Sequence, residues 1–478
     1  MTEVAPDETD ADETVRIVAT SRNSNAPSGL TGDVVRPGDS GYDAARMGYN
    51  HLFAPQPDAV VFCADTQEVV DAVSWARRSG VPLRVRSGRH CLEGWSAADE
   101  GLVIDVSRMK SAMIDAASQT ATVGAGLTQL EMVTALGAAG FAAPTGTEGT
   151  VGLVGATLGG GFGLLTRRYG MASDNLLAAE VVVASTDGGA TTVIADEQNN
   201  PDLLWALRGA GNGNFGIVTS LTYRIHPVTH AIHVVATWPG LEQLSPAFDA
   251  WQRSAPHADD RLTSQLEIRP DKVVLVAVLV DGSSAEAQQI LAPILAVGKP
   301  QVLTDDARWA DVYAGFQIPP ADEAANWKFL SQFVYAPYPP QAIDLVASFM
   351  AKAPTPDCNY FTNAFGGTVR ASEPPGGSAF AHRDALFYAE PGAGWGVRGG
   401  IPAADDPLTD ECLRWCAEFG EALQPYVSGA YVNVPNAGMP EWESAYWGDN
   451  VERLRAIKAK YDPQNVFAFE QSLSADGG

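Results

Sequence analysis

A glycine-rich segment at residues 209–218, GAGNGNFGIV, constrains the fold of this chain most strongly. Residues 211–216 match G-x-G-x-x-G, a pattern that binds dinucleotides when a strand precedes it and a helix follows it. Here the order is reversed, because residues 202–207 have a helical pattern and residues 217–225 are rich in β-branched side chains. The sequence therefore excludes a Rossmann fold. It also lacks G-x-x-x-x-G-K-[ST], the usual motif of phosphoryl transfer.

Length and composition indicate a globular protein of two or three domains, since the chain has 478 residues, 46% of them hydrophobic and 18% charged. No apolar run reaches the roughly 20 residues of a membrane helix, so we expect no membrane partner. The formal net charge of -26 disfavours nucleic acid as a partner. Residues 1–41 begin with an acidic stretch that is unlike a signal peptide. We predict a disordered tail there and a cytoplasmic location.

The five cysteines do not predict a metal site. Cys412 and Cys416 are four residues apart on a predicted helix, which would suit one buried helix face or half of a metal site. No second pair and no nearby histidine completes a zinc-binding set, so we expect buried free cysteines and no metal.

The N-terminal part of the predicted fold is a strand–helix–strand unit. Residues 59–63 form an apolar run, and Asp65 with Glu68 three positions later is typical of a helix start. Gly80 would end this helix, and residues 83–85 would form the next strand. That strand leads directly into RSGRH at residues 86–90. Further strands are expected at residues 102–106 and 120–123, and a helix at residues 128–136.

A second glycine-rich region covers residues 145–184. So many glycines are unfavourable inside a regular helix or strand, and they instead suit a backbone that approaches a pyrophosphate or a flat ring closely. A flexible surface loop is the alternative, but apolar side chains that favour burial are interleaved with the glycines.

Five motifs in order resemble the FAD-linked oxidases of the vanillyl-alcohol oxidase superfamily, in the berberine-bridge-enzyme-like branch. They are RSGRH with GWS after it, GLVIDVSRM at 101–109, TLGGGFGLLTRRYGMASDNL at 157–176, PDLLWALRGAGNGNFGIVT at 201–219, and the C-terminal segment 431–473.

This resemblance implies an α+β fold with an FAD-binding domain of two subdomains and a substrate domain built on a large antiparallel sheet. We expect residues 42–224 to bind FAD, residues 225–428 to form the substrate domain, and residues 429–478 to return to the FAD domain. Strands at residues 272–280, 359–371 and 385–389, with helices at residues 285–295 and 341–352 over the sheet's other face, are compatible with the substrate domain.

The resemblance also implies a covalent bond from His90 to the 8α-methyl group of the flavin. Many relatives add a second bond from a cysteine, but Glu148 stands in that place here, so we expect a single link. Cys91 does not replace it, because neighbours on an extended segment point to opposite faces. Arg89 stands where the family has glycine, and its cation would lie either beside the cofactor or in solvent. The residues expected to contact FAD are Arg86, Ser87, Gly88, Arg89, His90, Gly94, Ser96, Glu148, Gly149, Thr150, Gly152, Gly155, Ala156, Gly159, Gly160, Gly161, Gly163, Asp174, Asn175, Gly213, Asn214, Gly216, Ile217, Val218, Tyr431 and Asn433.

Family chemistry implies hydride transfer to the flavin while a base takes a proton from the substrate. Tyr431 is a candidate phenolate base, with packing as the alternative role. His382 is expected either to titrate near neutrality or to anchor its strand. Tyr388 follows six residues later and would lie on the same face of a regular strand. Glu373 is a loop carboxylate, placed over the ring or in solvent. Aromatic residues alternate at positions 327–335 and suit either a flat or sugar-like ligand or the core.

We therefore predict an oxidase for a small alcohol or similar activated C–H, from secondary or carbohydrate metabolism, with O2 as electron acceptor. A flavin dehydrogenase or a catalyst of oxidative ring closure or rearrangement is the alternative, and a non-catalytic flavin-binding protein is a more remote one. A homodimer is left open.

Overall fold

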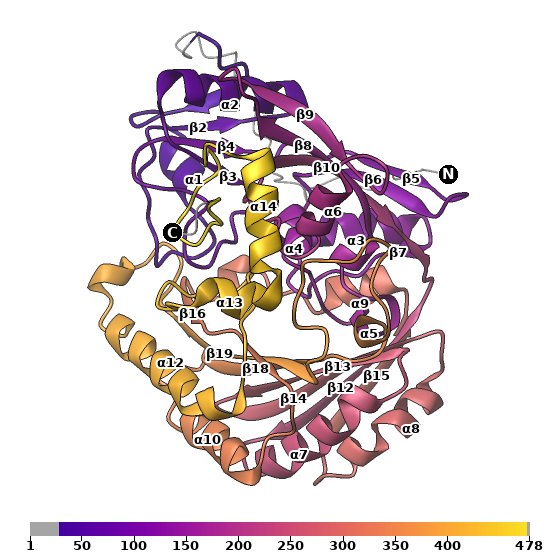
Figure 1. Cartoon of the computed structure of the whole chain (residues 1–478). Helices are drawn as coiled ribbons and strands as arrows, with labels where there is room; N and C mark the ends of the chain where they lie inside the picture. The colour runs from indigo at the N-terminus through magenta and orange to yellow at the C-terminus, as the bar shows by residue number, and fades with distance from the viewer. Residues whose placement is uncertain (1–27, 476–478) are drawn as a thin grey trace, which may run out of the picture.

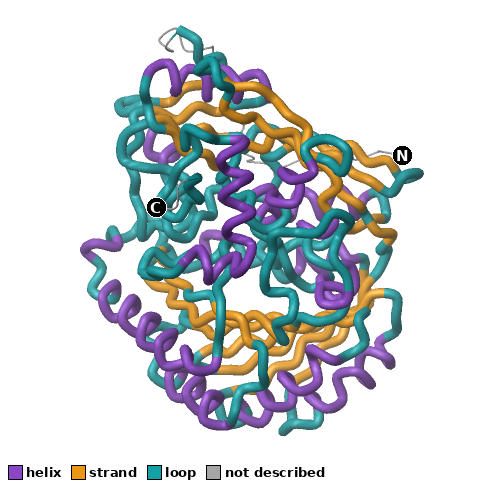
Figure 2. Tube along the Cα trace, viewed as in Figure 1, coloured by secondary structure: helices purple, strands orange, loops and turns teal. Residues whose placement is uncertain are grey.

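The computed structural model describes residues 28–475, which form two halves stacked on each other (Figure 1). One half contains two small sheets and the C-terminal helices. The other is a large antiparallel sheet with a row of helices on its outer side (Figure 2). This arrangement confirms the α+β class with a large antiparallel sheet.

The first small sheet has the strand order β1-β2-β4-β3, and its β2, β3 and β4 run parallel. Asp65 accepts a hydrogen bond from the Glu68 backbone N–H at 2.9 Å, and Gly80 ends the helix at a φ of 65°, as the sequence predicted. The elements are β1 (Asp33–Val35), α1 (Tyr42–Arg46), β2 (Ala59–Phe62), α2 (Thr66–Ser79), β3 (Leu83–Arg86) and β4 (Leu102–Asp105).

The boundary predicted at residue 42 is wrong, because β1 precedes it. Val34 of β1 pairs with Val61 of β2, and its side chain is buried in the core beneath this sheet. Three residues are too short for a recognisable strand pattern, and the pairing with β2 decides their conformation. The rest of the predicted tail, residues 1–27, lies outside the described residues.

The second small sheet has five antiparallel strands in the order β5-β6-β10-β8-β9. The G-x-G-x-x-G segment lies between α6 and β10, so the predicted reversal of helix and strand is confirmed. The elements are β5 (Ala112–Asp115), β6 (Thr120–Gly124), α3 (Gln129–Ala138), α4 (Leu153–Leu158), α5 (Thr166–Tyr169), β8 (Leu176–Ala184), β9 (Ala190–Ala195), α6 (Pro201–Leu207) and β10 (Ile217–Arg224). A two-stranded pair, β7 (Phe141–Ala142) and β11 (His226–Pro227), follows at its side.

The large sheet has the order β15-β12-β14-β13-β18-β19-β16, and β17 also pairs with β19. Its strands are β12 (Ala231–Pro239), β13 (Leu262–Arg269), β14 (Lys272–Val280), β15 (Gln301–Ala307), β16 (Asn326–Phe329), β17 (Gln332–Val334), β18 (Asn359–Ala364) and β19 (Phe387–Trp395). The strand predicted over 359–371 is too long, because a helical turn, α11 (Thr368–Ala371), replaces its second half. A further helix, α9 (Trp309–Gly315), follows β15.

Four helices cover the outer face of the large sheet and share one apolar core with it (Figure 1). They are α7 (Leu244–Ser254), α8 (Ser284–Leu295), α10 (Pro340–Met350) and α12 (Thr409–Leu423). Cys412 and Cys416 are buried in this core, on one face of α12. Within residues 28–475 no group of three or more histidine, cysteine or acidic side chains is arranged to hold a metal ion. The same part of the chain contains no helix long and apolar enough to cross a bilayer.

Of the C-terminal helices, α14 (Val451–Tyr461) lies beside the small sheets, and α13 (Trp442–Trp447) lies between them and the large sheet (Figure 1). Trp447, Leu454 and Ile457 belong to the same apolar core as β2, α2 and β8. The side chain of Lys458 is fully buried, and its Nζ donates to Asn214 O, Asp462 Oδ2 and Phe467 O at 2.7–2.8 Å.

Lys458→Met is therefore expected to lower the free energy of unfolding by about 3–5 kcal/mol, because it leaves the Asp462 carboxylate buried without its cation. Urea denaturation followed by tryptophan fluorescence measures this loss. Lys460→Met is the matched control, since its ion pair with Asp202 is on the surface and such pairs contribute about 1 kcal/mol or less. Equal effects of the two variants would contradict the structural role of Lys458.

Candidate functional site

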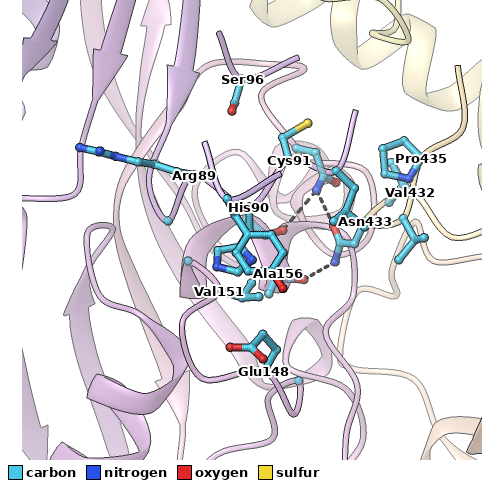
Figure 3. Close-up of a pocket in the computed structure, with 18 of the residues that line it drawn as sticks. Arg89, His90, Cys91, Ser96, Glu148, Val151, Ala156, Val432, Asn433 and Pro435 are labelled. Carbon is cyan, nitrogen blue, oxygen red and sulfur yellow. Dashed lines mark hydrogen bonds between the residues drawn. The ribbon is translucent and has the colours of Figure 1, made fainter. Parts of the chain in front are cut away.

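A cavity of about 610 Å³ lies between the small sheets and the inner face of the large sheet. This volume is in the range of cofactor and small-molecule sites. Its floor is formed by parts of residues 83–96, 146–162 and 212–218, together with residues 431–435 and 467–471 from the C-terminal segment. Its roof includes residues of β13, β16, β18 and β19. The Arg86–Ser96 segment, whose RSGRH motif the sequence singled out, therefore forms part of one wall (Figure 3).

The loop after β3 presents its backbone to the cavity. Arg86 fixes the end of β3 through a buried ion pair with Asp105, with Nε 2.7 Å from Oδ2. The backbone N–H groups of residues 88–91 donate to no acceptor within residues 28–475. Arg89 is in the left-handed region at a φ of 62°, and such turns form concave anion sites from successive N–H groups.

The Arg89 side chain does not face the cavity (Figure 3). Its guanidinium donates to Ala44 O at 3.0 Å, and its Nε lies 3.4 Å from Asp105 Oδ2. The sequence is compatible with this cation either beside the cofactor or in solvent. In the structure the Arg89 guanidinium instead lies beside the buried carboxylate of Asp105. The positive φ of residue 89 explains why glycine would suit this position.

Close backbone approach explains part of the second glycine-rich region. A Cβ on Gly88 would lie 2.1 Å from Gly152 N, and a Cβ on Gly159 would lie 2.1 Å from Asn433 Oδ1. A Cβ on Gly155, which lines the cavity, would meet nothing within 4 Å. Gly88 and Gly159 therefore allow segments to pack closely, and Gly155 leaves its part of the cavity wall without a side chain.

His90 is held in the cavity wall by contacts on its face and edge. Its ring stacks on Tyr49 with 4.0 Å between ring centroids, and the Arg398 guanidinium lies 4.7 Å from the centroid of Tyr49. His90 Nε2 lies 2.8 Å from Thr150 Oγ1. Burial, with a smaller contribution from the Arg398 charge, lowers the pKa of His90 to about 3, so the imidazole is neutral at physiological pH.

Glu390, in the roof of the cavity, is a functional candidate that the sequence analysis missed. The Tyr388 hydroxyl donates to its Oε2, and both side chains border the cavity from β19. Burial raises the pKa of Glu390 to about 7, which is suited to a general base at neutral pH. The available signal was a single carboxylate in the apolar run 387–395, two positions after Tyr388 and therefore on the same strand face.

Tyr431 contacts the cavity from the C-terminal segment. Its hydroxyl accepts from the Gly161 backbone N–H at 2.8 Å and from Asn433 Nδ2 at 2.7 Å. Asn433 Nδ2 also donates to Ala156 O at 2.8 Å. Burial raises the pKa of Tyr431, which is the opposite of what a phenolate base requires. The contacts support a role in positioning the floor of the cavity.

His382 lies outside the cavity lining and ties β17 and β19 to the C-terminal segment. Its Nε2 donates to Ala445 O at 2.9 Å, its Nδ1 accepts from the Tyr335 hydroxyl at 2.8 Å, and its ring stacks on Phe333. Burial lowers its pKa to about 4. These contacts support the anchoring role and not proton transfer to a substrate.

The aromatic residues at 327–335 do not share one face, because the chain leaves the sheet between β16 and β17. Trp327 and Phe329 stack at 5.2 Å between centroids and line the cavity. Phe333 packs in the core, and Tyr335 is 41% exposed.

The structure brings most of the predicted cofactor contacts to the cavity. Those that line it are Arg86, Ser87, Gly88, Arg89, His90, Ser96, Glu148, Gly152, Gly155, Ala156, Gly161, Gly213, Gly216, Ile217, Val218, Tyr431 and Asn433. Those that support the wall from behind or lie farther away are Gly94, Gly149, Thr150, Gly159, Gly160, Gly163, Asp174, Asn175 and Asn214. Asp174, for example, forms an ion pair with Arg383, and Asn175 holds the backbone of residues 169–171.

These residues fit FAD by their own geometry. The free N–H groups of residues 88–91 suit a pyrophosphate, and the cavity continues from them to the roof that carries Tyr388 and Glu390. Asn212 Oδ1, also at the cavity, is buried and has no hydrogen-bond partner within residues 28–475, so a bound group with a donor would satisfy it.

Comparisons with known proteins agree with this fit. The family model described as "FAD binding domain" matches residues 57–190, and the one described as "Berberine and berberine like" matches residues 430–474. The uncharacterized FAD-linked oxidoreductase YgaK of Bacillus subtilis is 36% identical over 93% of this chain and 97% of its own. Aclacinomycin-N/aclacinomycin-A oxidase of Streptomyces galilaeus is 28% identical over 91% of this chain and 88% of its own.

The solved structure of Physcomitrella patens BBE-like 1 has a TM-score of 0.85 and 27% identity, over 93% of this chain and 97% of that one. The fold, the matched motifs and the relatives therefore agree, and the chain belongs to the berberine-bridge-enzyme-like family of FAD-linked oxidoreductases.

Proposed function

We propose that this enzyme is an oxidase that binds FAD covalently through His90 alone and removes a hydride from the C–H bond of a small alcohol or a similarly activated substrate. Dioxygen is the electron acceptor in this proposal. The observation that carries it is the pairing of two groups across one cavity: a neutral imidazole in the floor and the Tyr388–Glu390 pair in the roof.

FAD would be held by the backbone amides of residues 88–91, by the cavity-facing backbone near Gly155 and Gly213, and by the Tyr431–Asn433 pair. When bound, it supplies a two-electron acceptor for the hydride. Glu390 then accepts the hydroxyl proton of the substrate, and Tyr388 orients the carboxylate. Trp327 and Phe329 offer a flat apolar surface beside this pair.

A single covalent link is supported by the state of Cys91. Burial raises the pKa of its thiol, so the nucleophilic thiolate is disfavoured. In Figure 3 its sulfur points away from the His90 ring. Glu148, at the position of the second link in relatives, cannot form a thioether.

Acid precipitation of the purified protein tests the cofactor proposal. We expect a yellow pellet, because covalent flavin stays with the denatured chain. A panel of alcohols, amines and sugars is then added without oxygen, and bleaching at the flavin band identifies substrates. Rapid return of colour in air supports the oxidase, whereas slow return favours the dehydrogenase or ring-closing alternative. A yellow protein that no member of the panel bleaches would favour the non-catalytic alternative.

A further inference from the structure

His90, Thr150 and Glu148 form a chain of hydrogen bonds in the cavity wall. His90 Nε2 lies 2.8 Å from Thr150 Oγ1, and Thr150 Oγ1 donates to Glu148 Oε1 at 2.7 Å. The Thr150 backbone N–H also donates to Glu148 Oε1, at 3.0 Å. The chain therefore leads from the imidazole to a carboxylate through one hydroxyl group.

The turn that carries Glu148 and Thr150 is fixed from both sides. Gln129 Nε2 donates to Glu148 O at 2.6 Å, and the Gly149 N–H donates to Gln317 Oε1 at 2.6 Å. Tyr49 holds the other partner, because its ring stacks on His90. The alignment is thus set by the surrounding fold and does not depend on a mobile loop.

The direction of these hydrogen bonds defines the tautomer of His90. A carboxylate only accepts hydrogen bonds, so the Thr150 hydroxyl hydrogen is directed at Glu148. Thr150 Oγ1 must then accept from His90, which places the ring hydrogen on Nε2. Nδ1 consequently carries the lone pair, and it has no hydrogen-bond partner within residues 28–475.

We propose that Glu148, acting through Thr150, prepares His90 for its own attachment to FAD by exposing the Nδ1 lone pair and accepting the Nε2 proton. Both residues are positioning residues in this step. The proposal rests on the covalent link at His90 proposed above, and it gives Glu148 a function at the position where relatives carry a second link.

A bond would form between His90 Nδ1 and the 8α carbon, a C–H bond of that methyl group would break with its proton released to water, and the two electrons of that C–H bond would remain on the ring. Dioxygen, as a two-electron oxidant, returns the ring to its oxidised form. Substitution at Nδ1 leaves the imidazole positively charged until its Nε2 proton leaves, and the Thr150 hydroxyl passes that proton to Glu148. The buried site disfavours the charged ring, so removal of this proton favours attachment.

Four variants of the full-length protein test the relay, with covalent and total flavin measured separately. Glu148→Gln keeps an acceptor for Thr150 but removes the base, and Thr150→Val interrupts the chain while Glu148 remains. For both we expect normal reversible FAD binding. Attachment should be slowed about tenfold or more, a threshold set below the usual 10²–10⁴-fold contribution of a general base. Thr150→Ser should restore the rate. Asp322→Asn is the charge control, because Asp322 also borders the cavity but contacts neither His90 nor Thr150.

The rate of attachment is measured on protein produced under riboflavin limitation. This protein is mixed with FAD, and the flavin fluorescence that stays with the chain after denaturation is recorded over time. Mass spectrometry and NMR of the flavin peptide identify the bonded atom, which we expect to be His90 Nδ1. Wild-type protein without covalent FAD would refute the link itself. Covalent wild-type FAD with unchanged rates in both Glu148→Gln and Thr150→Val, or a bond at Nε2, would overturn only the relay. Should Glu148→Gln fail to bind FAD, Thr150→Val decides the question, since it retains the Glu148 charge.

Discussion

His90→Ala protein is expected to release all of its flavin into the supernatant on acid precipitation, whereas the wild-type pellet remains yellow. His90 is the one histidine bordering the cavity within residues 28–475, and its neutral ring is a competent nucleophile. The variant should still bind FAD reversibly, because the backbone N–H groups of residues 88–91 do not depend on the side chain. Its flavin should also be reduced more slowly by substrate, since a covalent bond of this kind raises the reduction potential.

In-gel flavin fluorescence of denatured protein measures the first effect, and anaerobic stopped-flow absorbance measures the second. His382→Gln is a suitable control, because His382 is also buried and neutral but packs outside the cavity. It should keep its covalent flavin even if its stability falls. Covalent flavin in His90→Ala would show that another residue forms the bond.

The elements with strong local signals were predictable from the sequence. Helix α2 has both of its end signals, and β14 matches the predicted apolar run at residues 272–280. The exclusion of a Rossmann fold was correct, because a helix precedes the G-x-G-x-x-G segment and a strand follows it. Both elements could be predicted from local side-chain patterns. β1 was missed because pairing with β2, a tertiary contact, determines its conformation.

The floor and the roof of the cavity differ in how far the sequence could define them. The floor is built from loops whose backbone geometry requires particular residues, such as glycine at positions 88 and 152, so its motifs are readable. The roof is built from side chains that alternate on β13, β18 and β19, and their register depends on strand pairing. His382 and Tyr388 were expected on the same face of one strand, but β19 begins only at Phe387, so His382 lies outside it and only Tyr388 reaches the cavity.

Glu390→Gln is expected to slow flavin reduction by about 10²–10⁴-fold, because the amide cannot accept the substrate proton. The isosteric amide still accepts the hydrogen bond from Tyr388, so the roof keeps its shape. With covalent FAD unchanged, anaerobic reduction by any substrate that bleaches the wild-type protein gives the rate of the chemical step. Glu373→Gln is the control, since Glu373 is an exposed carboxylate outside the cavity lining.

The pH profile separates a lost base from a distorted roof. Burial raises the pKa of Glu390 to about 7, so the wild-type reduction rate should rise as pH increases and level off above pH 7, where the carboxylate is ionised. Glu390→Gln should lose this rise. The raised pKa also predicts how the free energy of unfolding depends on pH. The folded protein holds the Glu390 proton more tightly than the unfolded chain, so the free energy of unfolding should fall as pH rises toward and through 7. The variant has no charge to bury and should be at least as stable as wild type at pH 8. Reduction at the wild-type rate would show that Glu390 is not the base in this cavity, and loss of stability at pH 8 would contradict the cost assigned to its buried charge.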